Sequence, residues 1–198
     1  MMNQFKQLNF LLEQHGGMIQ TAQVVKAGIS KPVFYDYIKE RKLEQVAHGV
    51  YVSEDAWVDS MFLIHLRSSQ SIFSHETALF FHDLTDREPL SYSVTVKRGY
   101  NTSRLKADGI MVYTVKEELH GLSITTAQTP FGHTVPTYDM ERTICDIIRY
   151  RNQMEMQTFH DALKQYTKRK DKNLRRLMKY AKQLRVEKIV GQYLEVLL

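Results

Sequence analysis

Residues 28–52, GISKPVFYDYIKERKLEQVAHGVYV, decide how the N-terminal part of this chain folds. Gly28 predicts the end of one helix, because only glycine adopts a positive φ angle at little cost. Ser30 is placed to cap a second helix, and Pro32 suits the first turn of that helix. Apolar side chains then recur at helical spacing and predict a buried face: Phe34, Tyr37 and Ile38.

The rest of this stretch predicts a small β-hairpin, because apolar residues alternate imperfectly from Leu43 to Val52 around a turn at His48-Gly49. A turn, a short helix and a hairpin form the second half of a winged helix-turn-helix. Lysines and a tyrosine on the exposed helix face, beside a turn with a histidine, suit entry into a DNA groove and contact with phosphates. The residues predicted to contact DNA are Ser30, Lys31, Tyr35, Lys39, Arg41, Lys42 and His48.

The same pattern also fits an αα-hairpin with a β-turn that only packs, or a helix-turn-helix used for protein contacts. Charge distribution bears on this choice. Residues 1–55 contain six Lys/Arg and six Asp/Glu, whereas residues 149–188 contain thirteen Lys/Arg and four Asp/Glu. Because a basic domain is the electrostatic mark of nucleic-acid binding, the C-terminal end is a candidate for a second polyanion-binding surface.

Length and composition bound the class of protein. The 198 residues hold one large domain or two small ones, and 43% hydrophobic residues are enough for a core. No apolar run approaches 18 residues and no cleavage site follows the N-terminal apolar patch, so neither a membrane span nor a signal peptide is expected. A single cysteine, Cys145, cannot form an intramolecular disulfide, which agrees with a cytoplasmic location.

We expect an α+β fold with two domains: a winged helix-turn-helix in residues 1–55 and a mixed domain in residues 56–198. The first domain begins with helices over 3–15 and 21–27. In the second domain, hydrophobic periodicity predicts a small sheet followed by a helical block. Its expected strands cover 91–97, 110–115 and 122–126, and its expected helices cover 57–66, 75–81, 139–150, 153–167, 173–184 and 186–197.

Three segments contain residue types that could support catalysis or metal binding. In SHETALFFHDL, residues 74–84, position 79 is leucine where an H-E-x-x-H zinc motif needs a ligand, so we expect no metal and histidines that hydrogen-bond backbone. Lys97 ends a predicted strand, as a lysine does in restriction-type nucleases, which place a metal-binding acid two residues before it. Thr95 occupies that position here, so we expect Lys97 to be a charged residue on an edge strand and not part of a nuclease site. No phosphate loop or nucleophile elbow is present, so we expect neither enzyme activity nor a cofactor.

The third segment is TYDMERTICDIIRYR, residues 137–151. Arg142 and Asp146 are four residues apart and are expected to pair on a helix surface, and Glu141 is expected to contact another arginine. A catalytic interpretation has no accompanying base or nucleophile.

Residues 164–185 contain ten Lys/Arg and one Asp, arranged around an apolar face at positions 174, 177, 178, 181 and 184. This is an amphipathic helix with a cationic exposed side. It is either an ordinary solvated face or a surface that binds phosphates or an acidic partner. The predicted polyanion surface consists of Lys172, Arg175, Arg176, Lys179 and Lys182.

The segment AGISKPVFYDYIKERKLEQVAHGVYV resembles the N-terminal winged helix of AbiEi-type antitoxins and related transcriptional regulators, with Leu43, Val46 and Gly49-Val50-Tyr51 at matching positions. SHETALFFHDL, ERTICDIIR and the closing YLEVLL resemble the C-terminal antitoxin domain of that family. The resemblance covers nearly the whole chain and depends on the order and spacing of these motifs. One departure is the wing, which is often rich in arginine in the family but reads Gln45-Val46-Ala47-His48 here.

The resemblance implies a type IV toxin–antitoxin system that acts in abortive infection, a form of phage defence. It implies that the C-terminal domain counters a nucleotidyltransferase-like toxin without a stable complex, and that the winged helix represses the shared operon by binding inverted repeats in promoter DNA. Two alternatives stay open: a stand-alone winged-helix transcription factor with a ligand-sensing C-terminal domain, and a degenerate nuclease.

Overall fold

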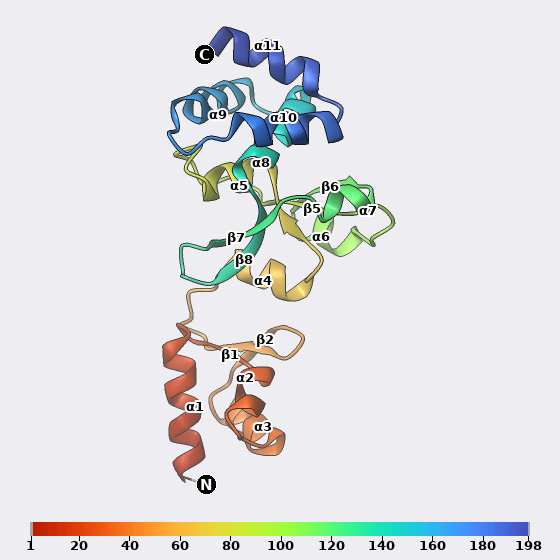
Figure 1. Ribbon diagram of the computed structural model, residues 1–198. Coiled ribbons are helices and arrows are strands. Elements are labelled where there is room, and N and C mark those ends of the chain that lie inside the picture. The colour runs from red at the N-terminus through yellow and green to blue at the C-terminus, as the bar shows by residue number, and fades with distance from the viewer. Residues whose placement is uncertain (1, 198) are drawn as a thin grey trace. The chain divides into compact units, whose positions relative to one another are not determined.

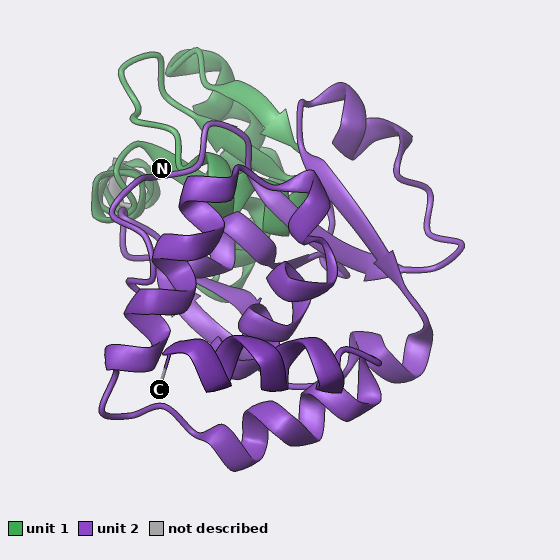
Figure 2. Ribbon diagram, turned by 90° about the horizontal axis from the view of Figure 1, so that it is seen from above, with its two compact units in different colours: residues 1–67 green, residues 68–198 purple. Residues whose placement is uncertain are grey.

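The computed structural model describes residues 2–197, and the chain divides into two compact units, residues 1–67 (unit 1) and 68–198 (unit 2) (Figures 1 and 2). The fold class is α+β, as expected. The division falls later than the expected boundary at residue 55. The reason is that helix α4 (Ser60–Arg67) packs its Leu63 against the sheet of unit 1 and so belongs to that unit.

Unit 1 contains the elements expected over residues 3–52, in the expected order. Its three strands form an antiparallel sheet in the order β1-β3-β2. Its elements are α1 (Met2–Gln14), β1 (Met18–Gln20), α2 (Thr21–Lys26), α3 (Lys31–Glu40), β2 (Glu44–Ala47), β3 (Val50–Val52) and α4.

The turn between α2 and α3 forms as the glycine predicts. Gly28 has a φ angle of 79°, and the Ile29 N–H donates to the Val24 carbonyl at 3.1 Å, which closes α2. Helix α3 then buries Phe34 and Tyr37. The Phe34 ring packs edge-on against Tyr51 with ring centres 5.5 Å apart, and the Tyr37 ring packs edge-on against Phe5 with ring centres 5.4 Å apart. These contacts fix which face of α3 points outward.

Unit 2 contains a five-stranded mixed sheet in the order β6-β5-β4-β8-β7, in which β4–β8 and β5–β6 are parallel (Figure 1). Its elements are β4 (Ile72–Phe73), α5 (His75–Phe81), β5 (Ser93–Lys97), α6 (Ser103–Ala107), β6 (Met111–Val115), α7 (Glu117–His120), β7 (Ile124–Gln128), β8 (Thr134–Tyr138), α8 (Met140–Arg149), a 3₁₀ turn (Arg151–Gln153), α9 (Met156–Lys168), α10 (Leu174–Gln183) and α11 (Glu187–Leu197).

Two expectations for this sheet need correction. Strand β8 was not predicted, because Pro136 lies within it and proline argues against an inner strand. Strand β4 meets β8 only at Thr137, so Pro136 is tolerated. Lys97 is not at a sheet edge, because β5 lies between β4 and β6; its Nζ pairs with Glu117 Oε1 at 2.5 Å.

Helix α8 is the centre of unit 2, and every residue from Met140 to Ile148 is buried. The Arg142–Asp146 pair is therefore buried, at 2.9 Å, and not on a helix surface as predicted. Arg142 also donates from Nη1 to the Leu119 carbonyl at 2.8 Å and lies 4.4 Å from the centre of the Tyr138 ring. Burial raises the pKa of Asp146, and Arg142 opposes that shift.

His75 is a second buried polar group in unit 2. It has a φ angle of 48° at the start of α5 and stacks on Tyr113 with ring centres 3.4 Å apart. Its Nδ1 lies 3.0 Å from Ser74 Oγ, whereas its buried Nε2 has no partner in the described part of the chain. Burial, reinforced by Arg142 and Arg149, lowers the pKa of His75 well below its usual value.

We expect Arg142→Met to destabilise unit 2 by about 3 kcal/mol, because it leaves the carboxylate of Asp146 buried without its partner. The double variant Arg142→Met/Asp146→Leu should recover most of the loss, since no charge is then left alone. Urea unfolding followed by circular dichroism measures both changes. A single variant as stable as the natural chain would contradict this account of α8.

We also expect unit 2 to lose stability as pH falls below about 6.5. In this range His75 becomes protonated in the unfolded chain but stays neutral in the folded unit, where its pKa is lowered. The loss should approach about 1.4 kcal/mol per pH unit for this proton. His75→Asn keeps a residue that tolerates positive φ and should flatten the slope between pH 7 and 5. His120, whose pKa burial also lowers, remains in that variant, so the slope should fall without vanishing.

Candidate nucleic-acid interface

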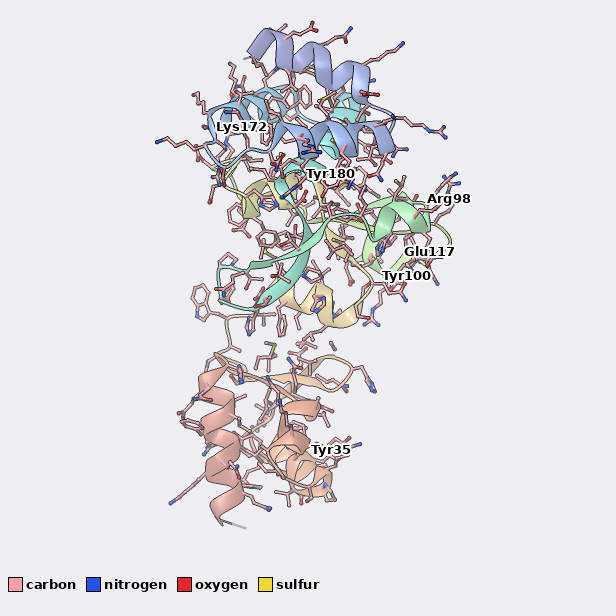
Figure 3. All side chains as sticks on the ribbon, in the orientation of Figure 1. Tyr35, Arg98, Tyr100, Glu117, Lys172 and Tyr180 are labelled. Carbon is pink, nitrogen blue, oxygen red and sulfur yellow. The ribbon has the colours of Figure 1, made fainter. Side chains whose placement is uncertain are left out.

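Unit 1 has a groove of about 760 Å³ between α2, α3 and the β2–β3 hairpin. Lys31 and Tyr35 line it from α3, and His48 lines it from the hairpin turn. Tyr35 projects from the outer face of α3 (Figure 3) and is 46% exposed, so its ring is accessible to a ligand in the groove. The structure thus brings together three of the residues predicted to contact DNA.

The hairpin turn is held in place by the backbone. The Thr21 N–H donates to the Gly49 carbonyl at 2.8 Å, which ties the turn to the first residue of α2. Gly49 has a φ angle of 67°, and a Cβ added there would lie 3.3 Å from Thr21 Oγ1. The positive φ angle and the close approach to Thr21 both favour glycine at this point of the turn.

The other predicted residues do not line this groove. Lys39 is exposed on α3, and Ser30 precedes α3 without a side-chain capping bond. Arg41 donates from Nη2 to Asn9 Oδ1 at 2.9 Å, so it also links α3 to α1. Lys42 is exposed with a φ angle of 52° at the end of α3.

Sequence reasoning missed the contribution of α2 and of strand β2. Gln20, Thr21 and Gln45 line the groove beside the predicted residues. Amides and hydroxyls supply the donors and acceptors that read base edges or phosphates. Gln45 lies in the quoted hairpin. It is a polar residue beside the apolar Val46, and this alternation was the sequence signal that could have identified it. Among the described residues that line the groove, none is acidic.

The predicted polyanion surface of unit 2 is smaller than the sequence suggested. Helix α10 buries Leu177 and Ala181, as its apolar spacing predicts. Arg176 is exposed but lies 3.6 Å from Glu141 and 3.9 Å from Asp139, which confirms that Glu141 contacts another arginine. The half-buried Lys172, labelled in Figure 3, donates from Nζ to the Arg169 carbonyl at 3.1 Å. The exposed cations that remain form the α10 basic face: Arg175, Lys179 and Lys182.

The residues considered for metal binding serve other contacts. The His82 Nε2 lies 2.7 Å from the Tyr138 carbonyl, in agreement with the expected backbone hydrogen bond. The same expectation is wrong for His75, because its Nδ1 lies against the Ser74 hydroxyl and its ring stacks on Tyr113. Within residues 2–197, no group of three potential metal ligands lies together. The residues 2–197 also contain no helix with the length and apolar character needed to cross a bilayer.

No protein-family model matches this chain, and no curated protein matches it. Among solved structures, the chain is similar to the RV2827C protein from Mycobacterium tuberculosis, with a TM-score of 0.57 at 13% sequence identity. The match covers 88% of this chain and 69% of that one. At this identity the likeness establishes a shared fold and nothing about activity.

Proposed function

We propose that unit 1 is a winged helix-turn-helix that binds promoter DNA, and that unit 2 is the antitoxin domain of a type IV toxin–antitoxin system. The groove formed by Lys31, Tyr35 and His48 is the observation that carries the first part. Helix α3, preceded by α2 and followed by the β2–β3 hairpin, has the element order of a recognition helix with its wing.

In this proposal α3 enters the major groove and the wing turn lies along the DNA backbone. Lys31, in the first turn of α3, and Tyr35, one turn later, face the same side of the helix and extend toward the DNA. Lys39 extends that row by another turn and contacts phosphate. No acidic side chain belongs to the described lining of the groove, and the exposed Asp36 and Glu40 of α3 lie outside that lining.

The antitoxin assignment derives from the family resemblance, and the α10 basic face supports it. Arg175, Lys179 and Lys182 lie four and three residues apart, so they share one exposed side of α10. The described residues place no carboxylate within ion-pair distance of these three side chains. A nucleotidyltransferase-like toxin acts on nucleic acid or nucleotides, and a cationic face of this kind competes for such polyanions or for an acidic surface of the toxin.

We expect Lys31→Ala/Lys39→Ala to weaken binding to the protein's own promoter by about tenfold or more, because two phosphate or base contacts are lost. The dependence of affinity on salt should also become shallower, since fewer counterions are released. Gel-shift titrations at several salt concentrations measure both effects.

The matched control, Lys6→Ala/Lys188→Ala, removes the same charge from exposed positions on α1 and α11 and should change promoter affinity by less than about twofold. Equal affinity of the Lys31→Ala/Lys39→Ala variant and the natural chain would refute a DNA-binding role for α3.

We expect Arg175→Glu/Lys179→Glu/Lys182→Glu to fold normally, because all three side chains are exposed, and to impair toxin neutralisation more than promoter repression. Co-expression with the adjacent toxin gene measures growth rescue, and a promoter–reporter fusion measures repression. Full rescue by this variant would show that the α10 basic face is only solvated. If the natural chain also fails to rescue growth but still represses, the stand-alone transcription factor is the better interpretation.

A further inference from the structure

Unit 2 contains a pocket of about 400 Å³ that lies apart from the α10 basic face. Four cations from four separate segments line it: Arg98, Lys116, Arg149 and Arg185. Strands β5 and β6 are parallel, so Arg98 and Lys116, which follow their last residues, lie together at the carboxyl ends of these strands. Arg98, labelled in Figure 3, extends from this end of the sheet beside α7.

The other two cations come from the helical block. Arg149 is in the last turn of α8, and Arg185 lies in the turn between α10 and α11. Among residues 2–197, no carboxylate lies within ion-pair distance of any of the four. Glu118 is the one acidic residue in the described lining, so the pocket keeps an excess of three positive charges.

The pocket also has an apolar wall. Leu119 is half-buried and so has accessible surface, and Val115 and Leu184, which are 5% and 2% exposed, close the pocket behind it. A wall of this kind offers contact to the carbon skeleton of a ligand, whereas the cations recognise its negative charge. A ligand with both an anionic group and an organic body fits these features together.

Arg185 occupies an unusual backbone position. It follows the end of α10 with a φ angle of 60°, and the Val186 N–H donates to the Ala181 carbonyl at 2.8 Å. This is the helix-ending position that glycine usually fills, because a Cβ is unfavourable there. Lys42 and Asp83 end α3 and α5 in the same left-handed conformation, so the backbone at Arg185 fixes where its side chain starts, and the case for a ligand depends on the pocket lining.

We propose that this pocket binds a small phosphorylated organic molecule of about the size of a nucleoside triphosphate. The phosphates contact the four cations, and the organic body lies against Val115, Leu119 and Leu184. The cations converge on one bounded pocket and do not follow a line along the surface, which favours a compact anion over a nucleic-acid strand. This proposal is independent of the DNA-binding role of unit 1.

Isothermal titration calorimetry of the full chain with ATP, adenosine and tripolyphosphate, without divalent ions, tests the proposal. ATP should bind and adenosine should not. Arg185→Gly and Arg98→Ala should each weaken ATP binding by about tenfold, the usual effect of losing a charge-assisted hydrogen bond. Lys188→Ala, which removes an exposed charge outside the pocket, is the matched control and should change affinity by less than about twofold.

Folding is controlled within the same set of variants. Arg185→Gly should keep or raise the melting temperature, because glycine suits the left-handed position. The Arg98 backbone N–H keeps its bond to the Val115 carbonyl in Arg98→Ala. A loss of ATP binding in these two variants is therefore not a loss of fold.

Several results would overturn the proposal. These are no binding of ATP by the natural chain, an ATP affinity in both pocket variants equal to that of the natural chain, or tripolyphosphate binding as tightly as ATP, which would leave no role for the apolar wall. A fourth is that Arg185→Gly weakens binding to duplex DNA of arbitrary sequence but not to ATP. The pocket would then be part of a nucleic-acid surface.

Discussion

Burial of the charged helix α8 is the constraint on which the rest of unit 2 depends. Helix α8 contacts α5 and also α9, α10 and α11, so no side of it before Arg149 is left to water. Three charged side chains, Glu141, Arg142 and Asp146, lie within this buried stretch, and an unpaired charge in such a place costs roughly several kcal/mol. Each of them must therefore meet a partner that the surrounding elements supply, and this requirement determines how those elements pack.

The partners of α8 come from the segments that build the candidate surfaces. Arg142 donates a hydrogen bond to the Leu119 carbonyl near the end of α7, and this bond keeps that segment against α8. Glu141 Oε1 accepts the Asn173 N–H at 2.9 Å, at the start of α10. Tyr180, labelled in Figure 3, donates from its hydroxyl to Asp139 Oδ2 at 3.1 Å. Because α10 is held at both its start and its middle, its basic face has a defined direction.

Much of the fold followed from local sequence signals. Gly28, Pro32 and the His48-Gly49 turn determine their surroundings within a few residues, so helix ends and the hairpin were predictable. Strand β8 was not predictable, because the tolerance of Pro136 depends on how short its partner β4 is. Arg142 and Asp146 were correctly paired but wrongly placed at the surface, since helical spacing gives the contact and says nothing about what covers it.

The candidate sites show the same limit more sharply, because total charge over a segment did not indicate where charge gathers. Residues 1–55 are neutral in sum, yet all six of their acidic residues are exposed and none lines the groove of Lys31 and His48. The excess of positive charge in residues 149–188 divides among different uses. Arg176 contacts Glu141, the α10 basic face points outward, and Arg149 and Arg185 enter the pocket.

That pocket could not be predicted from any one segment. Two of its cations, Arg98 and Lys116, come from residues 56–148, the part of the chain in which acidic residues outnumber basic ones. They meet the helical cations only because β5 and β6 run parallel, so that the carboxyl ends of both strands lie side by side. A site assembled by sheet topology leaves no periodic signal in the sequence, and its charge becomes visible only when distant segments are brought together.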